Sequence, residues 1–308
     1  MEELPVRERP ARLRVGVVGA GRVGSVLGAA LSRAGHDVTA ASGVSDASRR
    51  RIAARLPGAR VAEPPQVVAD CDLVLLSVPD DALPALAAGL AELADAEGTL
   101  VAHTSGRYGH TVLDPLLRAG ALPLALHPVM TFTGRDEDLS RLASCSFGVT
   151  SPDRLRPIAE ALVVEMGGEP VWIPEERRGL YHAALAGAAN HLVTLVAESA
   201  QLLGAAGVEH PGRMLGPLLG AALDNGLRLG TAGLSGPVVR GDAGTVARHL
   251  EELAAVSDEA LAAYRSLARL TAVRALDSGL LKPDQAEALL AVLNGPAPGR
   301  EDRRGQPE

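Results

Sequence analysis

The chain has 308 residues, of which 47% are hydrophobic, 22% charged and only 2% aromatic, and its net charge is −7. This length accommodates two domains with separate cores. The acidic balance and the scarcity of aromatic side chains argue against nucleic acid as a partner, because such partners select basic surfaces and stacking platforms.

Short apolar strands alternate with helical stretches through the first half of the chain. Alternation of this kind is typical of βαβ units with helices on both faces of a parallel sheet. We therefore predict an α/β Rossmann fold with a doubly wound, mainly parallel sheet. The expected strands are 13–18, 36–41, 72–78, 99–103, 122–126, 147–150 and 170–173, and the expected helices are 23–34, a stretch ending at 55, 82–93 and one beginning near 153.

After Pro174 the alternation stops, and the composition is helical to the end of the apolar sequence. We expect an all-α C-terminal domain that is apolar at nearly every helical phase, which predicts a homodimer formed through it. One long helix is expected over 175–206, with others at 212–229, 243–256, 258–278 and 283–293. The predicted organisation is a flexible arm (1–12), a Rossmann dinucleotide-binding domain (13–174), a helical substrate and dimerisation domain (175–294) and a disordered tail (295–308).

The cysteines and the apolar runs indicate a cellular compartment. Cys71 and Cys145 are the only cysteines, too few for a zinc or disulfide framework, so no metal site is expected. The first residues are charged and lack the apolar core of a secretory signal. Asn190 and His191 interrupt the apolar stretch after Tyr181, so no run long enough to span a bilayer is expected. These features predict a cytoplasmic protein without a membrane partner.

A glycine-rich turn follows the first expected strand and opens the first helix. Residues 19–24 read GAGRVG, so that Gly19, Gly21 and Gly24 form GxGxxG around Arg22 and Val23. In a dinucleotide site these glycines permit the tight turn, the approach of the pyrophosphate and the close packing of helix on strand. The position between strand and helix is the context that the motif requires. The sequence therefore predicts a dinucleotide site.

The end of the second strand indicates which dinucleotide binds. NAD sites usually place an acidic residue there for the ribose hydroxyls, but this chain has Ser42 followed by Gly43. A serine with arginines nearby, at Arg22 and in the run 49–51, suits a 2′-phosphate better, although the run also reads as a solvated helix face. NADP is therefore predicted over NAD.

Polar residues stand at the ends of three further strands, where open parallel sheets bind their ligands. Ser77, Val78 and Pro79 are expected beside the nicotinamide ribose. Ser105 is expected to contact cofactor or substrate, and His127 to face the substrate. The alternatives are that Ser105 caps the next helix and that His127 is buried against a backbone carbonyl.

The helical domain carries three further candidates. His182 and Asn190 lie eight residues apart on the long helix, on one drifting face. Hydride transfer to a carbonyl or imine needs a proton donor and a group that orients the oxygen or nitrogen, roles that His182 and Asn190 could fill. Arg240, in a turn ahead of a later helix, could bind a substrate carboxylate. The alternative for Asn190 is a structural hydrogen bond.

The chain resembles a bacterial family whose members join a Rossmann-like domain to a C-terminal helical domain of unknown function. The resemblance implies kinship with β-hydroxyacid dehydrogenases, ketopantoate reductases, pyrroline-5-carboxylate reductases and deazaflavin-dependent NADP reductases. It rests on the segments GAGRVG (19–24), SVPDD (77–81), HTSG (103–106), HPVMTF (127–132), YHAALAGAANHLV (181–193) and SGPVVRGD (235–242).

The resemblance also exposes a departure from the chemistry of the group. In the hydroxyacid and ketopantoate branches a catalytic lysine lies one turn before an asparagine, and here Ala186 stands before Asn190. Lys282 is the only lysine and lies far along the chain. The expected function is NADP-dependent reduction of a small 2-oxo acid or a related carbonyl or imine compound, with ketopantoate as the lead. The alternatives are a non-catalytic dinucleotide-binding regulator and a deazaflavin-dependent NADP reductase.

Overall fold

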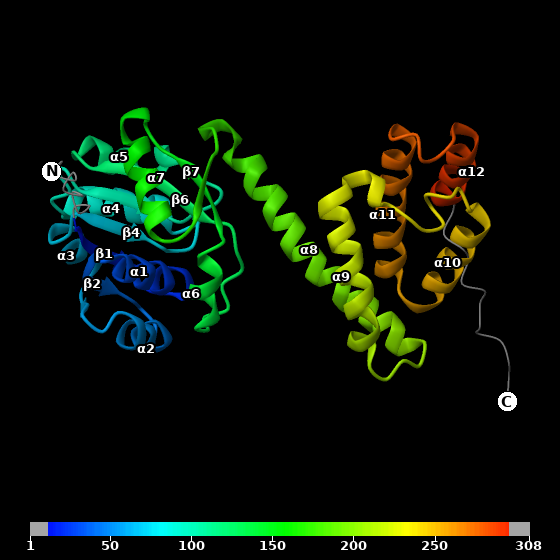
Figure 1. The fold of residues 1–308 in the computed structure, drawn as a ribbon, viewed down its shortest axis with the longest axis horizontal. Coiled ribbons are helices and arrows are strands. Elements are labelled where there is room, and N and C mark those ends of the chain that lie inside the picture. Colours follow the sequence, from blue (N-terminus) through cyan, green and yellow to red (C-terminus); the bar gives the residue numbers. More distant parts are fainter. Residues whose placement is uncertain (1–11, 296–308) are drawn as a thin grey trace, which may run out of the picture. The chain divides into compact units, whose positions relative to one another are not determined.

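The computed structural model describes residues 12–295, which form two compact units divided between Ala188 and Ala189 (Figure 1). Apart from residues 12 and 295, the predicted arm and tail lie outside the described residues. The division falls within a long helix, farther along the chain than the boundary expected at Pro174. The first turns of that helix therefore belong with the sheet.

The first unit is built on an eight-stranded sheet in the order β3-β2-β1-β4-β5-β6-β7-β8. Neighbouring strands are parallel except β6 and β7, which are antiparallel. The predicted fold class, a mainly parallel Rossmann-type sheet followed by helices, is confirmed. The strands are β1 (Arg14–Val18), β2 (Asp37–Ser42), β3 (Arg60–Val61), β4 (Leu73–Leu76), β5 (Leu100–His103), β6 (Leu122–Pro128), β7 (Ser146–Thr150) and β8 (Glu169–Trp172).

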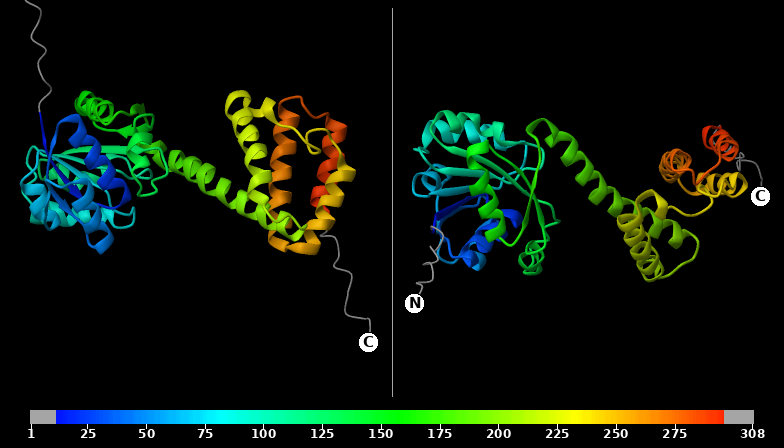
Figure 2. Two further views of the ribbon diagram at one scale, coloured as in Figure 1. Left: turned by 60° about the horizontal axis from the view of Figure 1, so that its bottom comes forward. Right: turned by 45° about the horizontal axis from the view of Figure 1, so that its top comes forward.

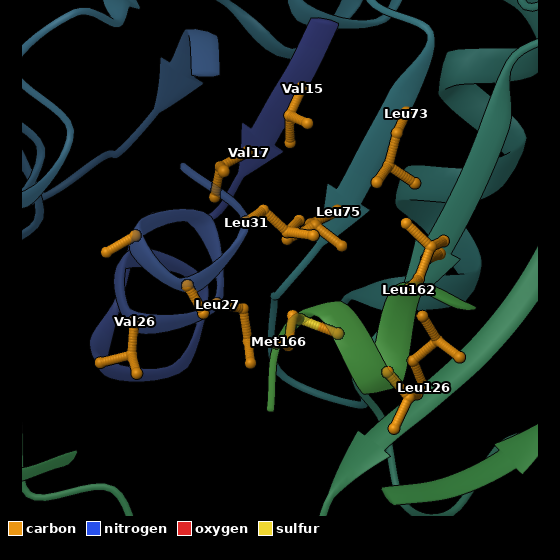
Figure 3. Packing of buried hydrophobic residues seen from close by; sticks show 14 of the residues in the cluster. Val15, Val17, Val26, Leu27, Leu31, Leu73, Leu75, Leu126, Leu162 and Met166 are labelled. Atoms are coloured by element: carbon orange, nitrogen blue, oxygen red, sulfur yellow. The ribbon is translucent and has the colours of Figure 1, made fainter. Parts of the chain in front are cut away.

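Helices cover both faces of this sheet (Figure 2). Successive strand residues point to opposite faces, so Leu73 and Leu75 join one buried cluster while Val74 and Leu76 join the other. Figure 3 shows the first cluster, in which strand residues pack against Leu27 of α1 and Leu162 of α7. The helices are α1 (Arg22–Ala34), α2 (Asp46–Arg55), α3 (Pro64–Ala69), α4 (Leu83–Leu93), α5 (Asp114–Arg118), α6 (Glu137–Leu142) and α7 (Arg156–Glu165).

The long helix α8 (Arg178–Ala205) starts in the first unit and continues into the second. In the second unit a separate core holds three helices together, and Ser257 caps one of them by accepting the amide of Ala260. The helical prediction for this part of the chain is confirmed. The remaining helices are α9 (Pro211–Leu229), α10 (Ala243–Val256), α11 (Asp258–Asp277) and α12 (Pro283–Asn294).

The expectation that no stretch is long and apolar enough to span a bilayer was wrong. The helical stretch Glu175–Ala205 reaches a mean hydropathy of 1.2 over 18 residues, and none of that window is buried inside the structure. Asn190 and His191 do not offset the many alanines, leucines and valines around them. Length and composition alone are weak evidence for a membrane span, but they show an apolar surface that needs a cover.

Candidate active site

The glycine-rich turn is fixed by close contact between the ends of β1 and β4. Gly19 has φ of +87°, a conformation that favours glycine, and a Cβ there would lie 2.5 Å from the carbonyl oxygen of Ser77. A Cβ at Gly24 would lie 2.5 Å from the carbonyl oxygen of Gly19. Val78 also lies against Gly19. Two of the three motif glycines are thus required by the protein itself, and the structure brings them together with the predicted Ser77 and Val78.

Gly21 differs from the other two glycines. It occupies the N-cap position of α1 with φ of −76°, and the nearest atom to a Cβ there would be the carbonyl oxygen of Gly19 at 3.9 Å. The protein leaves this space open, beside amides of the first helical turn that lack intrahelical acceptors. An open cradle at a helix N-terminus fits a dinucleotide pyrophosphate, which needs the backbone to approach closely.

Several predicted cofactor residues have structural partners as well. Ser42 is 8% exposed; its hydroxyl accepts the amide of Gly19 at 3.3 Å and its carbonyl accepts the amide of Ala20 at 2.8 Å. The hydroxyl of Ser77 accepts that of Thr104 at 3.3 Å. Both serines therefore brace the turn, and their contact with a cofactor stays a prediction. Among the other predicted residues, Arg22 and Pro79 are exposed and Val23 packs partly against the core.

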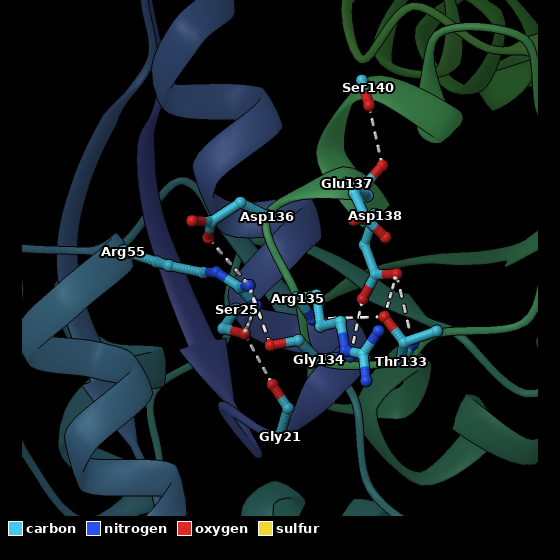
Figure 4. A network of polar contacts seen from close by, with 10 residues as sticks. All are labelled: Gly21, Ser25, Arg55, Thr133, Gly134, Arg135, Asp136, Glu137, Asp138 and Ser140. Carbon is cyan, nitrogen blue, oxygen red and sulfur yellow. Dashed lines mark hydrogen bonds and ion pairs between the residues drawn. The ribbon is translucent and has the colours of Figure 1, made fainter.

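A loop between β6 and α6 lies over the start of α1, a feature that the sequence did not indicate (Figure 4). The fully buried carboxylate of Asp138 accepts the amides of Thr133 and Gly134 at 3.1 and 2.7 Å, which fixes the turn. Arg55 of α2 then joins the loop to α1, donating to the carbonyl of Gly134 at 3.0 Å and to the hydroxyl of Ser25 at 3.5 Å.

This loop brings two arginines of different elements together. A Cβ at Gly134 would lie 3.4 Å from Cγ of Arg22 and 3.8 Å from Nε of Arg51. Asp46, the acidic residue nearby in the sequence, pairs with Arg49 instead, at 3.7 Å. The predicted Arg22 thus gains Arg51 as a neighbour at the edge of the dinucleotide turn, and Arg49 does not belong to this pair.

The carboxyl edge of β6 carries a histidine–tyrosine pair. Nδ1 of His127 and the hydroxyl of Tyr181, in the second turn of α8, form a hydrogen bond of 2.8 Å. The ring of His182 lies 6.1 Å from that of His127, centroid to centroid. Cβ atoms would not fit beneath this group: at Gly148 one would lie 2.2 Å from the Tyr181 hydroxyl, and at Gly106 one would lie 2.7 Å from the His182 ring.

Burial sets the protonation of this pair. Burial, followed by the nearby Arg178 and His182, lowers the pKa of His127 to about 4. Burial raises the pKa of Tyr181 to about 12, against an opposing effect of Arg178. At neutral pH the imidazole is therefore neutral and the phenol keeps its proton. His127 was expected as a possible acid, and its geometry instead makes it the hydrogen-bond partner of an acid.

Ser105 takes the structural alternative considered for it. Its hydroxyl accepts the amides of Arg107 and Tyr108, both at 3.2 Å, and it is 6% exposed. The neighbouring His103 is fully buried, accepts the amide of Ser105 on Nδ1 at 3.2 Å and lies 2.8 Å from the carbonyl of Gly109. These contacts hold the segment after β5, and a role of Ser105 in ligand binding stays a prediction.

The structure does not bring all predicted residues into one place. Asn190 and Arg240 belong to the second compact unit and are exposed. The carbonyl of Asn190 accepts the hydroxyl of Thr194 at 3.1 Å, and the carbonyl of Arg240 accepts the amide of Gln285 at 3.4 Å. Both side chains remain candidates, while His127 and His182 lie together in the first unit.

Comparisons with known proteins agree with this architecture. Residues 3–128 match the Rossmann-like domain family, and residues 145–271 match a domain of unknown function called DUF2520. The chain therefore joins a Rossmann-like domain to a DUF2520 domain, and the resemblance stated from its motifs is confirmed.

Individual relatives are NAD(P)-dependent oxidoreductases by name. A glycerol-3-phosphate dehydrogenase [NAD(P)+] of a Bradyrhizobium strain is 30% identical over 201 residues, which cover 59% of this chain and 59% of the relative. A Bacteroides fragilis protein described as a candidate NADP oxidoreductase shares the fold with a TM-score of 0.69 and 22% identity, over 85% of this chain and 98% of its own. An imine reductase of a Pseudomonas species has a TM-score of 0.65 and 20% identity, over 91% and 99%.

Proposed function

We propose that the chain is an NADP-dependent reductase of a small C=N or C=O compound, an imine or a 2-oxo acid. The observation that carries the proposal is the hydrogen bond of 2.8 Å between Tyr181 and His127, at the carboxyl edge of the sheet that bears the dinucleotide turn. Open parallel sheets bind cofactor and substrate at this edge. The names of the relatives support a nicotinamide dinucleotide as the cofactor.

The preference for NADP rests on Arg22 and Arg51. Their side chains meet at Gly134, within a loop that Asp138 and Arg55 hold in place. Two guanidinium groups on a braced loop suit a phosphate dianion, whereas the ribose hydroxyls of NAD would need a carboxylate. Replacing Arg51 by Ala should weaken NADPH binding more than NADH binding. Replacing Arg49 by Ala is the matched control, because Arg49 pairs with Asp46.

The proton comes from Tyr181. A bound reduced nicotinamide supplies a hydride to the carbon of the double bond, which leaves a negative charge on its nitrogen or oxygen. The phenol of Tyr181 gives its proton to that atom, and the tyrosinate so formed regains a proton from water. His127, neutral and hydrogen-bonded to the same hydroxyl, orients it. His182, beside them, is the second candidate for the acid.

The test combines binding with turnover. NADPH and NADH are titrated by fluorescence, and cyclic imines and 2-oxo acids, ketopantoate among them, are screened with the cofactor that binds. Tyr181→Phe should lower turnover by about 10²–10⁴-fold while NADPH affinity stays within a few-fold. An equal loss in His182→Ala, with Tyr181→Phe active, would assign the acid to His182. NADPH binding without turnover of any compound would favour a regulator, and turnover only with a deazaflavin would favour the third alternative.

The chain is also proposed to work as a homodimer in the cytoplasm. In the second unit α9 exposes apolar side chains, with Leu218 63% and Leu227 79% exposed, and Val193 on α8 is 69% exposed. A second copy of the chain would cover this surface, which is too apolar to face water alone. This explains the membrane-like composition of α8 without a bilayer.

A further inference from the structure

Arg178, the first residue of α8, is the largest side chain that the first unit buries completely, with 1% of it exposed. It donates from Nε to the hydroxyl of Thr150 at 2.7 Å. Its terminal nitrogens donate to the carbonyls of Gly148 at 3.0 Å, Ala125 at 3.3 Å and Ser105 at 3.5 Å. Its acceptors thus come from β6, β7 and the segment after β5.

All of these partners are neutral. Among the described residues no carboxylate forms an ion pair with Arg178, and Glu175, three positions earlier, instead accepts the amides of His110 and Thr111 at 2.9 and 3.3 Å. A buried cation without a counter-ion is costly, because charged groups lose hydration on burial. Burial accordingly lowers the pKa of Arg178 to about 10, which still leaves it charged at neutral pH.

The cation lies beside the proposed proton donor. Its guanidinium carbon is 5.6 Å from the centroid of the Tyr181 ring, one helical turn along α8. The backbone of Gly148, which accepts Arg178, also carries the Tyr181 hydroxyl against it, and His127 pairs with Gly148 across the β6–β7 ladder. One side chain thus anchors the start of α8 to the strand ends on which the His127–Tyr181 pair sits.

We propose that Arg178 is a positioning residue that fixes the first turn of α8 on β6 and β7 and holds a positive charge beside the His127–Tyr181 pair. The inference rests on the proposed function in one respect, the benefit to catalysis. The charge disfavours protonation of His127, and it stabilises the tyrosinate that remains after Tyr181 has given its proton. A lysine could keep the charge but could not reach several carbonyls with one planar fork.

The experiment measures the titration of His127 by NMR, with His127→Asn identifying its signals among those of the eight histidines. His103, Tyr181, His182 and Arg178 are the titratable groups around it. In the wild-type protein His127 should stay neutral from pH 8 to pH 5. Arg178→Gln removes the charge but keeps an amide donor, and should raise the pKa of His127 by about one unit, as loss of a nearby like charge does. Arg178→Lys should leave that pKa near the wild-type value.

Thr150→Val is the matched structural control, since it removes one acceptor of Arg178 and leaves the charge. It should lower the melting temperature without moving the titration of His127. An ordinary pKa near 6.5 for His127 in the wild-type protein, or equal titrations in Arg178→Gln and Arg178→Lys, would overturn the inference. The wild-type measurement decides even if Arg178→Gln does not fold. Because none of these readouts uses a substrate, failure of the proposed reductase activity would be seen separately, as absent NADPH turnover.

Discussion

Gly21 offers a test in which cofactor binding and stability should move in different directions. It is the N-cap of α1, and a Cβ there meets no atom of the protein closer than 3.9 Å. Aspartate is among the best N-cap residues, because its carboxylate accepts amides of the first turn. Gly21→Asp should therefore leave the free energy of unfolding unchanged or raise it by a few tenths of a kcal/mol.

The same carboxylate would occupy the space and the amides that the pyrophosphate needs. Two unit charges about 4 Å apart near a protein surface repel by about 4 kcal/mol, which corresponds to a roughly 10³-fold loss of affinity. NADPH affinity is read by fluorescence titration, and stability by urea unfolding of the same samples. We expect no measurable NADPH binding by a variant that is at least as stable as the wild-type protein.

Gly24→Ala is the comparison for this variant. Its new methyl group would lie 2.5 Å from the carbonyl oxygen of Gly19 and 3.0 Å from Cβ of Ser77, so it should lose stability as well as binding. If Gly21→Asp binds NADPH like the wild-type protein, the dinucleotide does not lie on this turn. If Gly21→Asp unfolds instead, the N-cap reasoning is wrong.

Three further predictions follow from the same structure. Gly148→Ala, whose Cβ would lie 2.2 Å from the Tyr181 hydroxyl, should abolish turnover of a confirmed substrate while NADPH titration stays near wild type; unchanged turnover would remove Tyr181 from the chemistry. His103 and His127 have pKa values of about 4 in the folded chain, so the unfolded chain binds more protons below pH 6.5 and stability should fall with pH, by about 2 kcal/mol for each histidine between pH 7 and pH 5; urea unfolding that is independent of pH would contradict this. Sedimentation at micromolar concentration should give twice 31.7 kDa, and a monomer would refute the proposed dimer.

The sequence predicted the elements well because their signals are local. The apolar strands and the GAGRVG turn determine β1 and α1, and each strand that was expected is present. The pairing of β7 could not be read in the same way. It lies antiparallel to β6, and the hydrophobic pattern of a buried strand does not specify the direction of its neighbour. The two-residue strand β3 and the short helix α3 carry too few residues to give a periodic signal.

The site was harder to predict because its residues meet through tertiary contacts. Tyr181 was visible beside His182 in the sequence but received no role, since only the folded chain brings its hydroxyl to His127. Arg178 gave no signal at all: a single arginine at the start of a helix is ordinarily exposed. The loop at Gly134 was missed for the same reason, because Arg55 and Asp138 that hold it lie far apart in the chain.

The absent lysine can now be considered together with this geometry. In the branches that the chain resembles, a lysine is expected where Ala186 stands, so chemistry from the middle of the helix is not available here. Tyr181 lies earlier on the same helix, and its hydroxyl rests on the backbone of Gly148, where any larger residue would displace it. The loss of one proton donor and the space left for another are thus found on one helix. This arrangement favours altered catalysis over lost catalysis, because a regulator that only binds NADPH would have no need for a phenol held against a neutral imidazole.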